Sequence, residues 1–153
     1  MLANEIHAPS AQSVATIGHA LAFARRLPMS LPLLLARIGI AAVFFRSGLT
    51  KLDNWTLTVQ LFRDEYRVPL LPADVAASVA TFSELVFPVF IILGFATRLA
   101  ALPLLGMTIV IQLFVYPSSW VDHAMWAALL TLLIARGAGA VSLDMLLRRR
   151  FAA

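Results

Sequence analysis

Residues 75–96 read VAASVATFSELVFPVFIILGFA, and this stretch decides the fold class. It is long enough for a helix to cross a bilayer, and Glu84 is its only charged residue. Three more apolar stretches cover about residues 31–51, 99–117 and 120–141. We therefore predict an all-α fold, namely an integral membrane four-helix bundle with short amphipathic surface helices.

The composition of the whole chain supports a membrane protein. Of its 153 residues, 61% are hydrophobic and 13% are charged. A soluble domain has about 45–50% apolar and about 25% charged residues, so most soluble classes and intrinsic disorder are excluded. The net charge of +4 is dispersed, without a basic face interleaved with aromatic residues, so no nucleic-acid partner is expected.

The four spans divide the chain into three parts. Residues 1–30 are expected to form a cytoplasmic amphipathic segment, residues 31–144 the bundle, and residues 145–153 a basic cytoplasmic tail. Outside the spans, apolar residues repeat at helical spacing in two places: Val14, Ile17, Leu21 and Ala24, and then Trp55, Val59, Phe62 and Tyr66. Asp53 or Asn54 could cap the second of these helices. Each stripe fits either a helix on the membrane surface or one packed on the bundle.

Basic residues in the flanks of the spans predict the orientation. One side carries Lys51, Arg63 and Arg67, which neighbouring carboxylates offset. The other side carries most of the arginines: Arg25, Arg26, Arg98, Arg136, Arg148, Arg149 and Arg150. Because Lys and Arg accumulate on the cytoplasmic side, we expect both termini in the cytoplasm and the chain in a bacterial inner membrane.

Glu84 is the clearest candidate for a functional residue, because an ionisable side chain inside a span is costly. Pro88 follows one turn later and lacks the N–H that would bond the carbonyl of Glu84. A carboxyl and a free carbonyl at one kink could hold a proton, a hydroxyl or a quinone-like head group. The alternatives are an ion pair with Arg37 or Arg46, or a protonated Glu84 bonded to a neighbouring helix.

The first span carries charges on two faces. By the helical period, Arg46 lies roughly opposite the face that holds Arg37, Ala41, Phe44, Gly48 and Lys51. At least one of the two arginines should therefore face the bundle. Gly48 would permit a close helix approach beside Lys51.

Three polar residues are predicted near the outer ends of their helices: Arg46, Gln112 and His123. Tyr116 follows just above Gln112, and Trp120, His123 and Trp126 share a face at the start of the fourth span. If the helices converge, these residues line an outer-leaflet pocket with Glu84 at its floor. His123 also fits an ordinary interface histidine whose hydrogen bonds are satisfied. Tyr116 and Trp120 also fit the ordinary belt of interfacial aromatic residues.

No metal site is expected. The chain has no cysteine, which excludes disulfides, thiolate ligands and a cysteine nucleophile. His7 and His19 fall on the cytoplasmic side of the predicted topology, and His123 lies about 30 Å away on the outer side. The three histidines therefore cannot ligate one metal within a single chain.

The order and spacing of several short motifs resemble the DoxX family of small four-span membrane proteins. The motifs in the first span are RIG at 37–39 and FFRSGLTK at 44–51. ELVFP at 84–88 and GFATR at 94–98 follow around the second span, and GAGAVSLD at 137–144 follows the fourth. The resemblance covers about residues 31–144 and does not explain residues 1–27.

The resemblance implies redox-linked or quinone-linked membrane work and no defined reaction. The family's name comes from the membrane partner of a thiosulfate:quinone oxidoreductase, and related members are linked to oxidative-stress complexes. This favours an accessory subunit that binds a quinone, the one cofactor implied, or a similar apolar ligand near Glu84, Arg46 and His123. A protein partner or a homo-oligomer is then expected. The alternatives are a non-catalytic scaffold for a partner protein and a small-molecule carrier.

We predict that a reporter fused at Ala153 reads as cytoplasmic, because the arginine-rich flanks should stay on the inner side. The measurement pairs a reporter that is active only in the cytoplasm with one that is active only outside it. An external signal at Ala153, together with a cytoplasmic signal from an insertion after Arg67, would reverse the predicted orientation.

Overall fold

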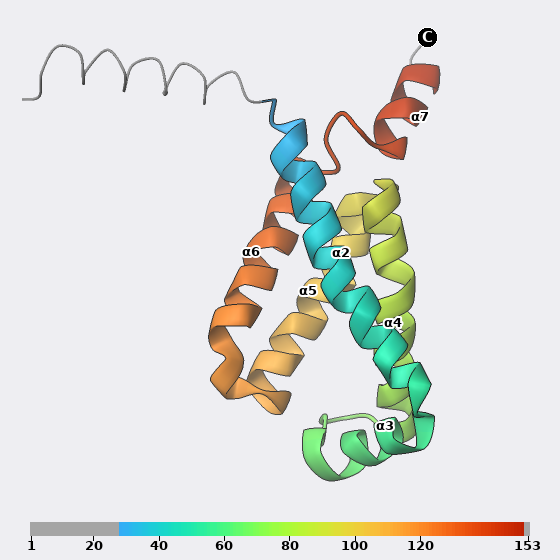
Figure 1. The fold of residues 1–153 in the computed structure, drawn as a ribbon, viewed down its shortest axis with the longest axis vertical. Helices are drawn as coiled ribbons and strands as arrows, with labels where there is room; N and C mark the ends of the chain where they lie inside the picture. Colours follow the sequence, from blue (N-terminus) through green and yellow to red (C-terminus); the bar gives the residue numbers. More distant parts are fainter. Residues whose placement is uncertain (1–27, 152–153) are drawn as a thin grey trace, which may run out of the picture.

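The computed structural model describes residues 28–151, and these residues form an all-α membrane bundle (Figure 1). Four helical segments are long and apolar enough to span a membrane. They are α2 (Ser30–Asp53), α4 (Ala73–Leu93), α5 (Thr97–Val110) continued by the π-helical turn η2 (Ile111–Val115), and the 3-10 turn η3 (Pro117–Ser119) continued by α6 (Trp120–Arg136). The predicted fold class is confirmed, and no strand occurs within the described residues.

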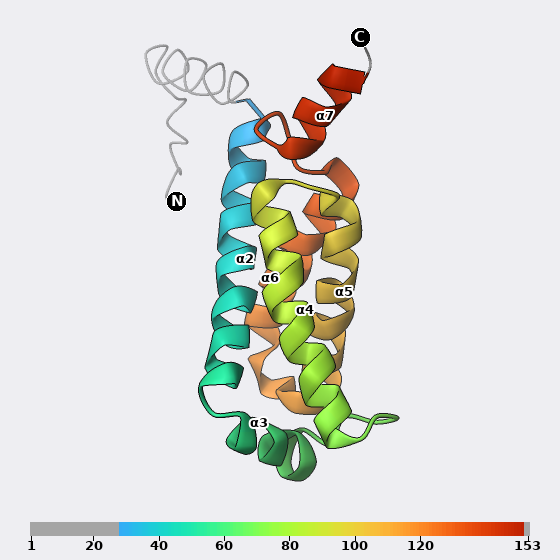
Figure 2. The ribbon, with the colours of Figure 1, turned by 90° about the vertical axis from the view of Figure 1, so that its right-hand side faces the viewer.

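Three shorter elements lie at the two ends of the bundle. α3 (Trp55–Leu61) and the π-helical turn η1 (Phe62–Tyr66) lie across the end where α2 finishes (Figure 2). α7 (Leu143–Phe151) lies at the other end, where α2 begins (Figure 1). We call these the α3 end and the α7 end. The described chain therefore begins and finishes at the same end of the bundle.

The core is an apolar cluster between the four long helices. α2 turns one face toward it, and Leu33, Ile40 and Phe44 on that face are at most 3% exposed. The opposite face of α2 and the outer faces of the other helices carry exposed apolar side chains such as Leu35 and Leu113. This is the pattern of a bundle surrounded by lipid, because lipid tails solvate apolar side chains as well as a protein core does.

Gly48 brings α2 and α4 into close contact, as predicted. A Cβ atom at this position would lie 2.9 Å from Cδ2 of Leu85 and 3.1 Å from Cβ of Glu84. Neither distance leaves room for a methyl group without a shift of its neighbours. The two helices therefore approach at the point where Glu84 faces α2.

Arg37 is the arginine of α2 that faces the bundle, and it anchors the α7 end. Its Nε donates to the carbonyl of Ile91 at 2.7 Å, and its Nη2 donates to the carbonyl of Ile92. Its Nη1 donates to the carbonyls of Val141 at 2.6 Å and Ala138 at 3.1 Å. One side chain thus joins α2, the end of α4 and the segment that follows α6.

The junction between α4 and α5 is built around Gly94. Gly94 has a φ of 68°, and a Cβ there would lie 2.5 Å from Cβ of Ser142 and 2.8 Å from Nη2 of Arg37. Its carbonyl accepts the backbone N–H of Asp144 at 2.9 Å. The carboxylate of Asp144 accepts the N–H of Ala96 at 2.8 Å, so α7 supplies a cap for the start of α5.

The fourth span is shorter than the stretch of residues 120–141 predicted from its apolar character. α6 ends at Arg136, and residues 137–142 leave the helix. The reason is tertiary: this segment turns back so that the carbonyls of Ala138 and Val141 meet Arg37. Apolar composition alone does not reveal that competing partner.

The stripe after the first span packs on the bundle. Asn54 caps α3, because its side-chain oxygen accepts the N–H of Leu57 at 3.0 Å. Phe62 is buried against Ala76 and Ala77 of α4, and Val59 and Tyr66 pack on the same cluster. The stripe predicted before the first span (Val14, Ile17, Leu21, Ala24) lies outside the described residues.

The two glycines of α2 provide a matched test of the close approach. Gly48→Ala should lower the stability of the bundle by about 1–3 kcal/mol, because it overpacks the contact with α4. Gly39→Ala makes the same chemical change where nothing lies within 4 Å, and should be neutral or slightly stabilising. Thermal unfolding in detergent measures both variants. A Gly48→Ala protein that melts at or above Gly39→Ala would contradict the packing described.

Candidate functional site

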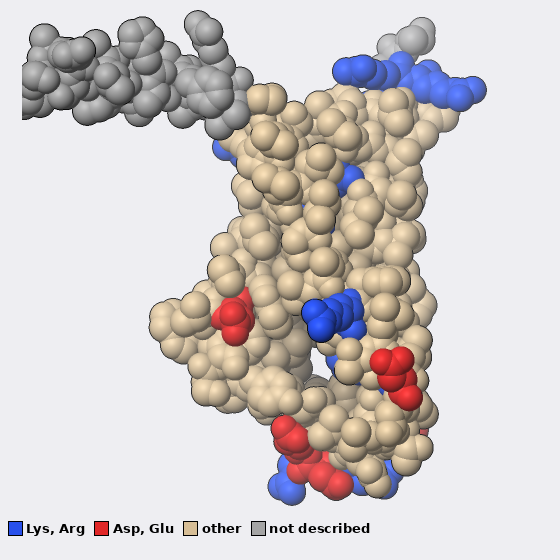
Figure 3. All heavy atoms as spheres, in the orientation of Figure 1, with Lys and Arg blue, Asp and Glu red and all other residues tan. Residues whose placement is uncertain are grey.

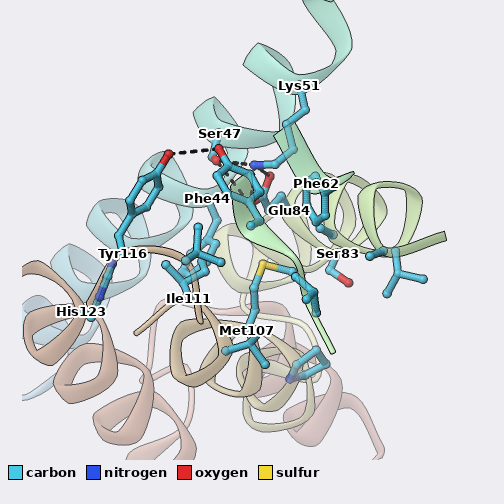
Figure 4. A pocket seen from close by; sticks show the side chains of 18 of the residues that line it. Phe44, Ser47, Lys51, Phe62, Ser83, Glu84, Met107, Ile111, Tyr116 and His123 are labelled. Atoms are coloured by element: carbon cyan, nitrogen blue, oxygen red, sulfur yellow. Dashed lines mark hydrogen bonds and ion pairs between the residues drawn. The ribbon is translucent and has the colours of Figure 1, made fainter. Parts of the chain in front are cut away.

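A cavity of about 420 Å³ lies inside the bundle near its α3 end. All four spans contribute to its walls, for example through Phe44 of α2, Ser83 of α4, Met107 of α5 and Trp126 of α6. Most of the lining is apolar. Figure 4 shows its polar side chains, and Figure 3 shows an opening in the lower half of one face of the molecule.

The strongest polar feature of the cavity is an ion pair between α2 and α4. Nζ of Lys51 lies 2.7 Å from Oε2 and 2.9 Å from Oε1 of Glu84. Ser47 completes the group: its hydroxyl accepts from Nζ of Lys51 at 2.9 Å and donates to Oε1 of Glu84 at 3.3 Å. The side chain of Lys51 is 18% exposed and that of Glu84 is 3% exposed. Figure 4 shows the two side chains pointing toward each other beside the cavity.

This pairing corrects the ion pair expected from the sequence. Neither Arg37 nor Arg46 is the partner of Glu84, because Lys51 holds both carboxylate oxygens. Arg37 instead bonds to backbone carbonyls at the α7 end, and Arg46 is exposed on the far face of α2. Lys51 reaches Glu84 because Gly48, about one turn before Lys51, lets α2 and α4 come into close contact.

Pro88 lies inside α4 and is buried, one turn from Glu84. It has no N–H to offer, so the carbonyl of Glu84 loses its usual partner along the helix. The carboxylate of the same residue is satisfied by Lys51 and Ser47.

His123 forms the second polar group of the cavity. Nε2 of Gln112 donates to the carbonyl of Pro117 at 2.9 Å, which turns its Oε1 toward Nδ1 of His123 at 2.7 Å. Nδ1 must then carry the proton, and Nε2 of the neutral ring is left as an acceptor. Gln112 does not line the cavity but orients the histidine that does.

An aromatic wall connects His123 to the first span. The ring of Trp126 meets His123 edge-on at 5.1 Å between centroids, and meets Phe44 at 5.7 Å. All three residues line the cavity. The predicted face of Trp120, His123 and Trp126 is thus only partly directed inward, because Trp120 is 64% exposed and is absent from the lining.

Two π-helical turns position the tyrosines. The N–H of Arg67 bonds to the carbonyl of Phe62 at 3.2 Å, and the N–H of Tyr116 bonds to that of Ile111 at 2.9 Å. Each bond spans five residues, the spacing of a π turn, and π turns are frequent at functional sites. The hydroxyl of Tyr116 then donates to that of Tyr66 at 3.2 Å, and both tyrosines line the cavity.

Burial raises the pKa of Tyr66 above its ordinary value, and the negative charges that Tyr116 and Glu65 carry when ionised add to the effect. Tyr66 follows α3 and lies outside the spanning helices. Its phenol therefore stays protonated at alkaline pH. Because the unfolded chain loses this proton first, the contribution of Tyr66 to stability declines as the pH rises above about 10.

The structure brings together only part of the predicted site. Glu84, His123 and Lys51 line the cavity, with Gln112 behind His123 and Gly48 and Pro88 close to Glu84. Arg46 and Arg37 do not line it. Three polar lining residues were missed as site residues: Ser47, Tyr66 and Ser83. The position of Ser47 one turn before Lys51 is a sequence signal that could have identified it.

The described residues contain no group of three or more His, Asp or Glu side chains placed to hold a metal ion.

These features define a class: a small polytopic membrane protein built as a four-helix bundle around a cavity. The chain belongs to the DoxX family, whose model matches residues 32–117. It is 35% identical over 129 residues to an uncharacterized protein of Haemophilus influenzae, a match that covers 76% of this chain and 83% of that protein. No solved structure matches this chain.

The two tyrosines are the only ones in the chain, so alkaline titration can test their environment. We predict that part of the tyrosinate absorbance of the folded protein develops at a pH above the ordinary tyrosine range. Tyr66→Phe should remove this late component, because Tyr66 is the residue whose pKa is raised. Tyr116→Phe should retain the late component but shift it to a lower pH, because Tyr116 contributes to the raised pKa of Tyr66. A late component that persists unchanged in Tyr66→Phe would contradict this site geometry.

Proposed function

We propose that this chain is a membrane accessory subunit of a redox or stress-response system in a bacterial inner membrane, and that its cavity binds a quinone or a similar apolar molecule. The observation that carries the proposal is the cavity at the α3 end, which combines apolar walls with an ion pair, a histidine and two tyrosines. The family relationship supports the redox setting.

The size and chemistry of the cavity suit a small apolar ligand. Binding pockets commonly have volumes of about 300–1,000 Å³, with mostly apolar walls and a few polar groups that orient the ligand. A quinone ring is flat and carries oxygen acceptors. The aromatic wall of Phe44 and Trp126 offers a face for such a ring. The hydroxyl of Tyr66 accepts from Tyr116 and keeps its own proton, so it is a donor on the lining.

The chain's own residues would hold and exchange protons at two positions. A bound quinone would supply the chemistry of accepting electrons and protons together. The carboxylate of Glu84 is an acid–base group, and its Oε2 lies 2.7 Å from the donor Nζ of Lys51. His123, oriented by Gln112, presents the free Nε2 as a proton acceptor on a second part of the lining.

The electrons would come from a partner, because the chain has no cysteine with which to accept them itself. We therefore propose that it acts with a protein partner or as a homo-oligomer. The lipid bilayer surrounds it through the exposed apolar faces of its four spans.

Native mass spectrometry of the protein, released from its own membrane in mild detergent, tests the proposal. The wild-type protein should carry a small apolar molecule. Ala80→Phe should lose it, because Ala80 lines the cavity and the larger side chain would occupy the space. Ala42→Phe is the control, since Ala42 lies on the exposed face of α2. The ligand-binding function would be rejected if the wild type carries no bound molecule, or if all three proteins carry it equally. A stoichiometric protein partner on a bundle without a bound molecule would favour a scaffold.

The ion pair separates a ligand role from a structural role. Glu84→Gln should cost on the order of 3 kcal/mol, because it leaves Lys51 without its carboxylate inside the protein. The double variant Glu84→Gln/Lys51→Met removes both charges and should recover much of that stability. We expect the double variant to fold and still to lose the bound molecule or the activity of the complex. Full retention of both would make the pair purely structural.

A further inference from the structure

A second cavity, of about 490 Å³, lies at the α7 end, far from the site described above. It is bounded by the start of α5, the end of α6, and α7 with the segment that leads into it. Three arginines from these three elements line it: Arg98, Arg136 and Arg148. The proposed redox function makes no use of this cavity.

The arginines have no carboxylate partner among the described residues. The one ion pair among the described residues joins Lys51 to Glu84, toward the α3 end of the bundle. Asp144 is the single acidic residue of the lining, and its two carboxylate oxygens accept the backbone N–H groups of Ala96 at 2.8 Å and Thr97 at 3.4 Å. The lining thus sets three guanidinium groups against one carboxylate, which caps α5, and it keeps a net positive charge.

Two further observations point to an anion. Gly137 leaves room for Arg98, because a Cβ at Gly137 would lie only 3.3 Å from Nε of Arg98. Thr97 lines the cavity, and its hydroxyl is buried without a hydrogen-bond partner. Figure 3 shows the same imbalance on a larger scale: on the face shown, acidic side chains appear only in the lower half, and basic side chains gather around α7.

We propose that this cavity binds a phosphate group, with the guanidinium groups of Arg98, Arg136 and Arg148 as its ligands. Guanidinium groups pair with phosphate oxygens through paired, charge-assisted hydrogen bonds. Arg98 and Arg136 lie at the ends of spanning helices, which is the depth of lipid head groups. The phosphate could belong to an anionic phospholipid or be free in solution, and the two sources are separable by experiment.

The test uses the full-length, delipidated protein in mild detergent and measures the shift in melting temperature. The added probes are phosphatidylglycerol, phosphatidylcholine and inorganic phosphate. Arg136→Gln/Arg148→Gln removes two ligands from the cavity. Arg149→Gln/Arg150→Gln is the matched control, because it removes the same charge from the same end, and neither residue lines the cavity. Arg136→Lys/Arg148→Lys keeps the charge without the paired hydrogen bonds.

We expect phosphatidylglycerol to stabilise the wild type and the control, and its apparent affinity for Arg136→Gln/Arg148→Gln to fall by at least about tenfold. The apparent affinity of Arg136→Lys/Arg148→Lys should lie between that of the wild type and that of Arg136→Gln/Arg148→Gln. The lysine variant also keeps the test valid if the glutamine variant does not fold. Stabilisation by inorganic phosphate with the same variant pattern would identify free phosphate as the source. An equal loss of affinity in both glutamine variants would indicate diffuse attraction to the basic tail and would overturn the proposal. No stabilisation by phosphatidylglycerol or by inorganic phosphate would also overturn it.

Discussion

A charge buried in a membrane bundle must be compensated by the protein itself, because the surrounding lipid offers no hydrogen-bond partner. Two such charges, Arg37 and Glu84, organise this structure. Arg37 is surrounded by backbone carbonyls at the α7 end, and Glu84 is held by Lys51 toward the α3 end. Both arrangements involve the same face of α2. They fix the rotation of α2 against α4 at two heights along the bundle. Apolar packing alone specifies such a rotation poorly, because lipid tails solvate an apolar helix face as well as another helix does.

The cavity follows from this arrangement. α2 packs mainly on α4, and α5 packs mainly on α6. The two pairs diverge toward the α3 end, as Figure 1 shows. Side chains of both pairs fill only part of the space between them, and α3 with η1 covers its end. The ion pair, the histidine and the tyrosines lie on the walls of this space because each is placed by a different helix or turn.

The sequence predicted the elements well and their tertiary partners poorly. Hydropathy locates the four spans, and helical periodicity places Arg37, Gly48 and Lys51 on one face of the first span, as the structure confirms. It does not show which charged residue of that face meets Glu84. That pairing depends on the relative height of two helices, which the close contact at Gly48 sets.

Some features that sequence reasoning could not predict depend on local departures from an α-helix. Tyr66 and Tyr116 reach the cavity through π turns, which no hydropathy pattern marks. The segment after Arg136 looked like a continuation of the span, and it is recruited instead by the guanidinium of Arg37. The motif at 137–144, conspicuous in the sequence, is thus explained by an architectural role at the α7 end.

The two π turns also bear on how such a chain could change over evolutionary time. A π turn holds one residue more than the α-helical turn that it replaces, so it is equivalent to a single-residue insertion. If the turn kept that residue and relaxed to an ordinary helix, everything beyond it would rotate by about 100°. In this chain the rotation would turn Tyr116 away from Tyr66 and separate the two hydroxyls that now meet at 3.2 Å. Losing one residue inside the turn would straighten the helix and leave Tyr116 facing Tyr66, whereas losing one elsewhere in the span would change the lining of the cavity while leaving all four spans in place.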